Sequence, residues 1–347
     1  MPERVDLYAS VGPTLTHYDV DVDNATLTGR GSVDLPSNVH YVWPHAHRGY
    51  LYVASSNSAS GIGGFVGDAH HVSALRIDDA TGELTAHGEP IALPTRPIHM
   101  TSDIPSRHLL VAFSNPSGLK VYGVSPDATP GAEIVQREAI DPGIYAHQVR
   151  VSPDNRLAIL VTRGHDAAAG KPEEPGALKV FRYEDGLLSD EVSIAPGGGY
   201  GFGPRHLDFH PTKPWVYVSL ERQNGLDMFA IDSGRLSPSL CSAKQPWPIP
   251  PASAGGRSPA PSTSTRTAAL FTWRTAPQAR SVRERNASLP AARTRSRCSR
   301  STPRAVSHAR SSTSILMGFI AEPFTSIPAA GFWSRRISSD CRSEPMA

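Results

Sequence analysis

The stretch A-H-Q-V-R-V-S-P-D-N-R-L-A-I-L-V-T, residues 146–162, holds the pattern that decides the fold. A short alternating strand leads into an Asp-Asn turn, and a strongly apolar strand follows. The pattern returns as P-I-H-M-T-S-D-I-P-S-R-H-L-L-V-A-F-S-N from Pro97, as P-R-H-L-D-F-H-P-T-K-P-W-V-Y-V-S-L-E from Pro204 and as V-H-Y-V-W-P-H-A-H-R-G-Y-L-Y-V-A-S-S-N from Val39. His99, His147 and His206 are predicted to occupy matching places, spaced by 48 and 59 residues.

A second strand pattern alternates with the first. It reads L-K-V-Y-G-V from Leu119 and L-K-V-F-R-Y from Leu178, with further copies from Leu15, Val72 and Leu226. Four short strands in every ~45–60 residues, repeated along the chain, are typical of propeller blades. A β-sandwich also has frequent strands, but it does not predict this longer period. We therefore predict an all-β propeller, with four to five blades in residues 1–242 and with residues 167–175 and 197–201 as loops between blades.

The overall net charge of +2 hides a sharp division of the chain. Residues 1–242 carry 18 basic and 28 acidic side chains, whereas residues 243–347 carry 16 basic and 4 acidic ones. Such an asymmetry can mark a disordered basic tail that binds nucleic acid. However, the last 105 residues hold 15 Arg and a single Lys, with Trp and Phe scattered among Ser, Pro and Ala. This composition is typical of GC-rich DNA read out of frame.

The genetic code offers a test of that interpretation. The codons permitted for residues 261–275, regrouped one base earlier, allow T-V-H-V-H-P-N-G-R-T-V-Y-V-A-N. The same shift over residues 319–337 allows F-H-R-R-T-F-H-I-D-P-S-G-R-L-L-V-A-A-N. Both strings repeat the pattern found four times upstream. We therefore predict that residues 243–347 are an out-of-frame tail of low order, and that the ring of blades stays incomplete with strand edges exposed.

Other features limit the cellular location and the partners expected for the protein. The chain has three cysteines, no apolar run of the ~20 residues that a membrane helix needs, and no basic apolar leader at Met1. These features predict a cytoplasmic protein without a disulfide framework. We expect a monomer that has neither a nucleic acid nor a membrane as its partner.

The quoted motifs resemble those of a known enzyme family. G-P-R-H-L-D-F-H-P from Gly203, A-H-Q-V-R-V-S-P-D-N-R from Ala146 and I-H-M-T-S-D from Ile98 resemble the bacterial 6-phosphogluconolactonases of the seven-bladed β-propeller lactonase family. Fungal carboxy-muconate lactonizing enzymes share that fold. The resemblance covers about two thirds of the chain. It implies a hydrolase that opens a sugar-derived lactone in the cytoplasm, with no metal and no other cofactor.

The resemblance also implies site residues. His147 matches the family's His in A-H-x-x-x-x-S-P-D, Arg205 matches the Arg of G-P-R-H, and Glu221 matches the acidic residue sixteen positions later. A further family Arg lies in an H-x-R-T-F motif, which this chain holds only in the shifted frame. Its loss predicts impaired activity for this product.

The chemistry of the three residues fits lactone opening. The reaction needs an activated water and stabilisation of a developing oxyanion. Either His147 or Glu221 can serve as the base, and Arg205 offers a fork of permanent donors. The competing structural interpretation makes His147 an ordinary buried histidine and Arg205–Glu221 an ion pair that holds blades together. His99 and His206 are expected to be mainly structural.

Other candidate sites are weaker, and several functions stay open. His45 with His47 and His70 with His71 lack a third metal ligand at a suitable spacing, so we predict no metal site. The glycine-rich loop at residues 197–203 lacks the Lys-Ser/Thr of a phosphate loop. The alternatives to a sugar lactonase are a muconate-type lactonizing enzyme, a non-catalytic scaffold that binds proteins, and an inactive pseudogene product.

Overall fold

Five four-stranded sheets make up the described part of the chain. The computed structural model describes residues 5–59, 64–168, 170–244 and 314–317. Four of the sheets are continuous in sequence, and each runs in chain order from its first to its last strand or the reverse. Their strands are β4 (Val39–Pro44), β5 (Tyr50–Ser56), β6 (His70–Ile77) and β7 (Leu84–Ala92); β8 (Pro97–Ser102), β9 (His108–Ser114), β10 (Ser117–Val124) and β11 (Pro130–Glu133); β12 (Ala146–Val151), β13 (Leu157–Thr162), β14 (Ala177–Glu184) and β15 (Leu187–Ile194); and β16 (Pro204–Phe209), β17 (Trp215–Leu220), β18 (Gly225–Asp232) and β19 (Arg235–Lys244).

The first sheet is assembled differently. It contains β1 (Val5–Val11), β2 (Thr14–Asp21) and β3 (Thr26–Asp34), and its fourth strand is β20 (Ser314–Met317). Strand β20 pairs with β1 in parallel, whereas the neighbouring strands in the four continuous sheets are antiparallel. The first sheet therefore takes a strand from far along the chain at its inner edge.

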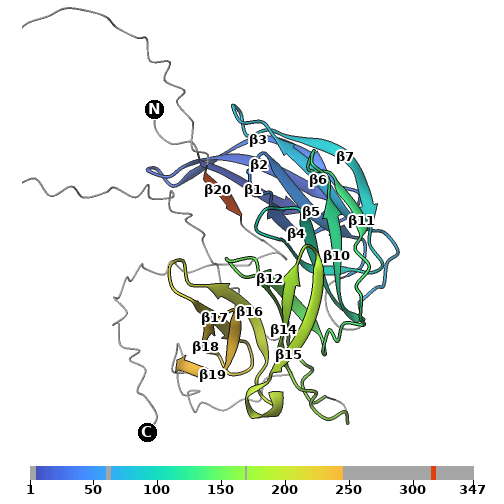
Figure 1. Cartoon of the computed structure of the whole chain (residues 1–347). Coiled ribbons are helices and arrows are strands. Elements are labelled where there is room, and N and C mark those ends of the chain that lie inside the picture. Colours follow the sequence, from blue (N-terminus) through green and yellow to red (C-terminus); the bar gives the residue numbers. More distant parts are fainter. Residues whose placement is uncertain (1–4, 60–63, 169, 245–313, 318–347) are drawn as a thin grey trace, which may run out of the picture.

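The sheets follow one another around a common centre like the blades of a propeller (Figure 1). Strands β4, β8, β12 and β16 lie toward that centre, and contacts between neighbouring blades join β4 with β8, β8 with β12 and β12 with β16. The predicted all-β propeller with four to five blades in residues 1–242 is confirmed. The predicted low order of residues 243–347 concerns a segment that lies, apart from Ala243, Lys244 and β20, outside the described residues.

Burial of apolar side chains explains why the blades stack. In the second strands β5, β9 and β13, as in L-L-V-A-F within β9, side chains on both faces are buried because both faces meet a neighbouring blade, whereas β17 is buried mainly on one face. Val111 and Met100 of one blade pack against Tyr52 and Ala54 of the preceding blade. Each large apolar side chain buried in this way contributes about 1.5–3 kcal/mol. The core is therefore a series of apolar layers between blades.

Two loops differ in their placement. Residues 197–201 lie between β15 and β16 and connect two blades, as predicted, with a short 3-10 turn at Pro196–Gly199. Residues 167–175 were predicted to do the same, and that prediction is wrong. They lie in the long connection between β13 and β14 of a single blade. The apolar strands on either side are alike in composition, so their order within a blade was not visible from the loop itself.

The turn between the first two strands of a blade repeats with its own cap. Arg48, Ser106 and Asn155 adopt positive φ angles of 55°, 55° and 60° at equivalent places. The side chain at the first turn position accepts hydrogen bonds from backbone N–H groups that would otherwise lack a partner. In one blade the Ser152 hydroxyl accepts from Leu157 at 2.9 Å, and in the preceding blade the Asp103 carboxylate accepts from Arg107 at 2.7 Å.

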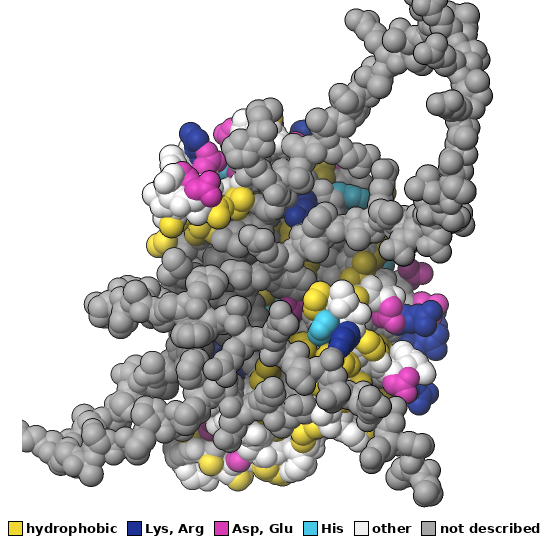
Figure 2. Space-filling view, turned by 90° about the vertical axis from the view of Figure 1, so that its left-hand side faces the viewer, with side chains coloured by type: hydrophobic (Ala, Val, Ile, Leu, Met, Phe, Trp, Pro, Cys, Tyr) yellow, Lys and Arg dark blue, Asp and Glu magenta, His cyan; other side chains and the backbone are white. Residues whose placement is uncertain are grey.

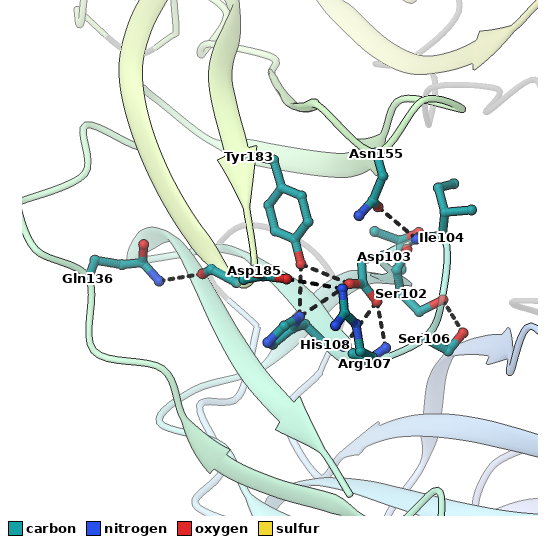
Figure 3. Close-up of polar contacts among 12 residues, drawn as sticks. Ser102, Asp103, Ile104, Ser106, Arg107, His108, Gln136, Asn155, Tyr183 and Asp185 are labelled. Atoms are coloured by element: carbon teal, nitrogen blue, oxygen red, sulfur yellow. Dashed lines mark hydrogen bonds and ion pairs between the residues drawn. The ribbon is translucent and has the colours of Figure 1, made fainter. Parts of the chain in front are cut away.

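Asp103 also joins two blades, at the end of the inner strands where these turns lie. Its Oδ2 accepts a hydrogen bond from the Tyr183 hydroxyl at 3.2 Å and lies 3.2 Å from His108 Nδ1. Figure 3 shows Tyr183 reaching from its own blade to this carboxylate. Asp103 is only 1% exposed, and burial opposes its ionisation, but its hydrogen bonds with His108 and Arg107 outweigh burial and lower its pKa.

Removing this carboxylate is expected to destabilise the protein. Asp103→Ala leaves backbone and side-chain donors buried without an acceptor, which should lower the free energy of unfolding by about 2–4 kcal/mol. Urea unfolding measures the change. Asp185→Asn is the matched control, because Asp185 is 72% exposed and forms a surface pair with Arg107, worth less than about 1 kcal/mol. Equal losses in the two variants would contradict the role given to Asp103.

Candidate active site

A β-bulge stands at the same place in four blades and sets up the site. Near the start of each inner strand, one residue has no partner on the second strand, because the register shifts between the residues on either side. The extra residue bends the strand and re-aims its own side chain. The four bulge residues are His40 in β4, Ile98 in β8, His147 in β12 and Arg205 in β16. His147 and Arg205 thus occupy equivalent positions in adjacent blades.

The expected equivalence of His99, His147 and His206 is wrong. His99 pairs with Ala112 and His206 with Ser219, so both stand one residue past a bulge. The residue at that position in β12 is Gln148, which pairs with Val161. His147 is displaced onto the bulge itself. One extra residue in a strand moves a side chain out of the ladder without changing the apparent motif.

Arg205 and Glu221 meet directly. Arg205 lies at the start of β16, and Glu221 follows the last residue of β17, so the pairing of these strands places them at one end of the blade. The Arg205 Nη1 atom donates to Glu221 Oε2 at 2.6 Å. Arg163, which follows β13 in the adjacent blade, donates its Nε to the same oxygen at 2.7 Å. Partial burial works against ionisation, but these two guanidinium groups hold the pKa of Glu221 below its ordinary value.

His147 lies beside this pair and is buried, with 6% exposure. Burial, followed by the positive charge of Arg205 and by His206 and His99, places the pKa of His147 well below its usual range. A hydrogen bond with the Arg205 backbone partly offsets this by favouring the protonated ring, so the ring is its donor. The Nδ1 atom has no partner among the described residues. His147 is therefore a neutral imidazole with one buried nitrogen left for a ligand or a water.

The three predicted site residues are thus brought together at one end of the inner strands. Arg205 touches Glu221 and adjoins His147, while His147 and Glu221 share no bond within the described part of the chain. The His147 ring meets the His206 ring edge to face, with 5.0 Å between centroids. His99 packs on Tyr41 at 4.1 Å. The mainly structural roles predicted for His99 and His206 stay predictions.

Sequence reasoning missed Arg163 and the charges behind it. Arg163 Nη2 contacts Asp166 Oδ2 at 2.8 Å, Asp166 Oδ1 contacts Arg222 Nε at 2.6 Å, and Arg222 bonds to Glu173. Glu173 also accepts the Gly201 backbone N–H at 2.5 Å. This donor of the glycine-rich loop is therefore already used. The signal in the sequence was the position of Arg163, immediately after an apolar second strand, as Glu221 is.

The weaker metal candidates do not join this site. His45 stands at the opposite end of its strand, and His70 bonds to Ser56 at 2.8 Å. In the described part of the chain, the one group with ligand spacing is Asp6, His17 and Asp19 in the first blade. His17 already bonds to Asp6 at 2.8 Å, and Arg30 bonds to Asp19. The metal-free character of the candidate active site stays a prediction.

Comparisons with known proteins decide the family. The family model described as "Lactonase, 7-bladed beta-propeller" matches residues 8–257. The chain belongs to this family. Its curated relatives include the 6-phosphogluconolactonase of Cronobacter sakazakii, 28% identical over 207 residues that are 59% of this chain and 54% of the relative. The enzyme of that name from Bacillus subtilis is 26% identical over 209 residues, or 60% and 55% of the two chains.

A solved structure agrees on the fold. The periplasmic gluconolactonase of Pseudomonas aeruginosa superposes with a TM-score of 0.53 at 20% identity, covering 69% of this chain and 66% of that one. The present chain spans about half the length of the curated relatives it matches.

Among the described residues, no helix has the length and apolarity to cross a membrane. On the face drawn in Figure 2, acidic and basic side chains lie intermixed where the surface is described.

Proposed function

We propose that the chain carries the active site of a lactonase that opens a sugar-derived lactone of the 6-phosphogluconolactone type. The observation that carries the proposal is the neutral, buried His147, whose Nδ1 lies without a partner next to Arg205. Membership of the lactonase family and the names of its curated relatives support it. A cytoplasmic, monomeric state and the absence of cofactors belong to the same proposal.

The reaction follows from the states of the three side chains. Glu221 is ionised and held by two arginines, so it is the poorer base, and its part is to fix Arg205. His147 takes a proton from water at Nδ1, and the hydroxide adds to the lactone carbonyl carbon. Arg205 donates to the oxygen that becomes negative. The carbon–oxygen bond of the ring then breaks, and the proton on His147 passes to the leaving alkoxide.

The direct test is lactone opening. The assay measures the acid released when 6-phosphoglucono-1,5-lactone or glucono-1,5-lactone opens. It uses a pH-stat near pH 6.5, where spontaneous opening is slow. The family's other chemistry is tested in parallel with a carboxy-muconate lactone. Opening of a sugar lactone above the buffer rate supports the proposal. A rate on the muconate lactone alone makes the chain a lactonizing enzyme. No rate on any of these lactones, with the chain folded, would leave a non-catalytic scaffold or an inactive product.

The pH dependence should report the depressed pKa of His147. A base works when it is unprotonated, so activity is present above its pKa and is lost as the pH falls through that value. An ordinary histidine would lose half the rate at about pH 6.5. Because the pKa of His147 is lowered, kcat/KM should stay level through pH 6.5 and fall only under more acidic conditions. His147→Gln should abolish this acid limb, whereas His87→Gln on the outer strand β7 should leave it in place.

A further inference from the structure

Two arginines share one carboxylate oxygen at the candidate site, yet their surroundings differ. Arg163 Nε contacts Glu221 at 2.7 Å, its Nη2 contacts Asp166 at 2.8 Å, and its Nη1 donates to the Gly164 carbonyl at 3.3 Å. Every nitrogen of the Arg163 guanidinium is therefore used. For Arg205, the bond to Glu221 is the one side-chain bond found within the described residues. Within the described residues, Nε and Nη2 of Arg205 thus remain without a side-chain bond and can meet a substrate, whereas each of the three Arg163 nitrogens already holds a bond.

The backbone fixes Arg163 in place. Its own N–H donates to the Tyr145 carbonyl at 3.0 Å, and the following Gly164 N–H donates to Ile144 at 3.0 Å. Gly164 has a φ of +71°, and a Cβ there would lie 2.3 Å from the Glu174 carbonyl oxygen. The chain can make this close turn only with glycine at that position. Arg163 therefore leaves its strand in a direction set by the backbone, toward the neighbouring blade.

The bond from Arg163 helps to keep Glu221 charged. Burial raises the pKa of Glu221, and the hydrogen bond from Arg163 is the largest influence that lowers it. The other charged or titratable groups that act on Glu221 are Arg205 and, on the same inner strand, His206. Asp166 acts on Arg163 from the β13–β14 connection. Without Arg163, Arg205 alone would oppose the effect of burial, so Glu221 would protonate more readily and would then bind Arg205 less firmly.

We propose that Arg163 is a positioning residue for lactone opening: through its bond to Glu221 it keeps that carboxylate ionised, so that Arg205 points its remaining donors at the substrate carbonyl. The inference rests on the proposed function. It adds to the site a residue from the neighbouring blade that touches no substrate. The chain Asp166–Arg163–Glu221–Arg205 then couples two blades to the orientation of a single guanidinium group.

The test compares Arg163→Ala and Arg163→Lys with Arg182→Ala in the full chain, on glucono-1,5-lactone. Arg182 is a matched control because it is 63% exposed and lies on a third strand. We expect Arg163→Ala to lower kcat by about tenfold to hundredfold, as a misplaced catalytic group does, with a smaller change in KM. The acid limb should move to higher pH, because Glu221 then protonates at higher pH. Arg163→Lys, which keeps the charge and one donor, should recover part of both effects.

A second readout keeps the inference separate from the proposed function. The pKa of Glu221 can be followed by carbon NMR of the side-chain carboxylates, with Glu221→Gln to assign the signal, whether or not any lactone is opened. If the wild-type chain opens no lactone, the proposed function is refuted. If the Glu221 pKa nevertheless rises in Arg163→Ala, the effect of the Arg163–Glu221 pair on that carboxylate still stands. An unchanged Glu221 pKa in Arg163→Ala would overturn the inference. So would an active Arg163→Ala chain that is less stable but keeps the acid limb of the wild type.

Discussion

A gene repaired by one base after about codon 243 is expected to yield a chain that opens glucono-1,5-lactone at least about 100-fold faster than the 347-residue chain, the effect of returning one oxyanion donor. The repaired frame restores the H-x-R-T-F motif and with it a second arginine for the site. It also restores alternating strands for the missing blades. In the present chain, β20 lies parallel to β1, where a propeller blade uses an antiparallel neighbour.

The repaired chain should also unfold differently. Closing the ring covers strand edges and buries more surface, so the dependence of the unfolding free energy on urea should become steeper. A chain ending at Ser242 is the matched control, because it lacks both the present tail and the repaired one. It should be as slow as the 347-residue chain. Equal activity and stability in the present and repaired chains would contradict the frameshift hypothesis, and sequencing codons 235–260 tests its premise directly.

Much of the fold was readable because propeller blades repeat. The four motif copies correspond to the pairs β4–β5, β8–β9, β12–β13 and β16–β17, and the second pattern marks each third strand and β2. Alternation and apolar runs are local properties of a sequence, so they survive without knowledge of the partner strand. The place of residues 167–175 within a blade could not be predicted from the local sequence. It depended on which strands the loop joins.

The site was predicted less completely, and the β-bulge explains why. His99, His147 and His206 look equivalent when the motifs are aligned on histidine. Aligned on the first residue of each inner strand, His99 and His206 stand third but His147 stands second. That offset was visible in the sequence, yet only strand register shows which residue is extra. Arg163 escaped for another reason, because its partner Glu221 lies 58 residues away on another blade.

Replacing Arg205 with alanine should have a large effect on lactone opening. It removes the donor aimed at the oxyanion, so kcat for lactone opening should fall by about 100- to 1,000-fold. It also removes the positive charge that, after burial, does most to lower the pKa of His147. The protonated ring then becomes easier to form. The acid limb of kcat/KM should therefore move to higher pH, measured by pH-stat from pH 4.5 to 8.

This pair of effects separates chemistry from architecture. In the Arg205→Ala variant Glu221 has no Arg205 left to hold and can still bond to Arg163, so a shifted acid limb reports His147 rather than Glu221. Arg205→Lys keeps a charge near His147 but loses the planar fork, so its limb should move less while kcat stays low. Arg182→Ala controls for loss of an exposed arginine. An ion pair that only holds the blade would give the opposite result: lower stability, with kcat and the acid limb unchanged.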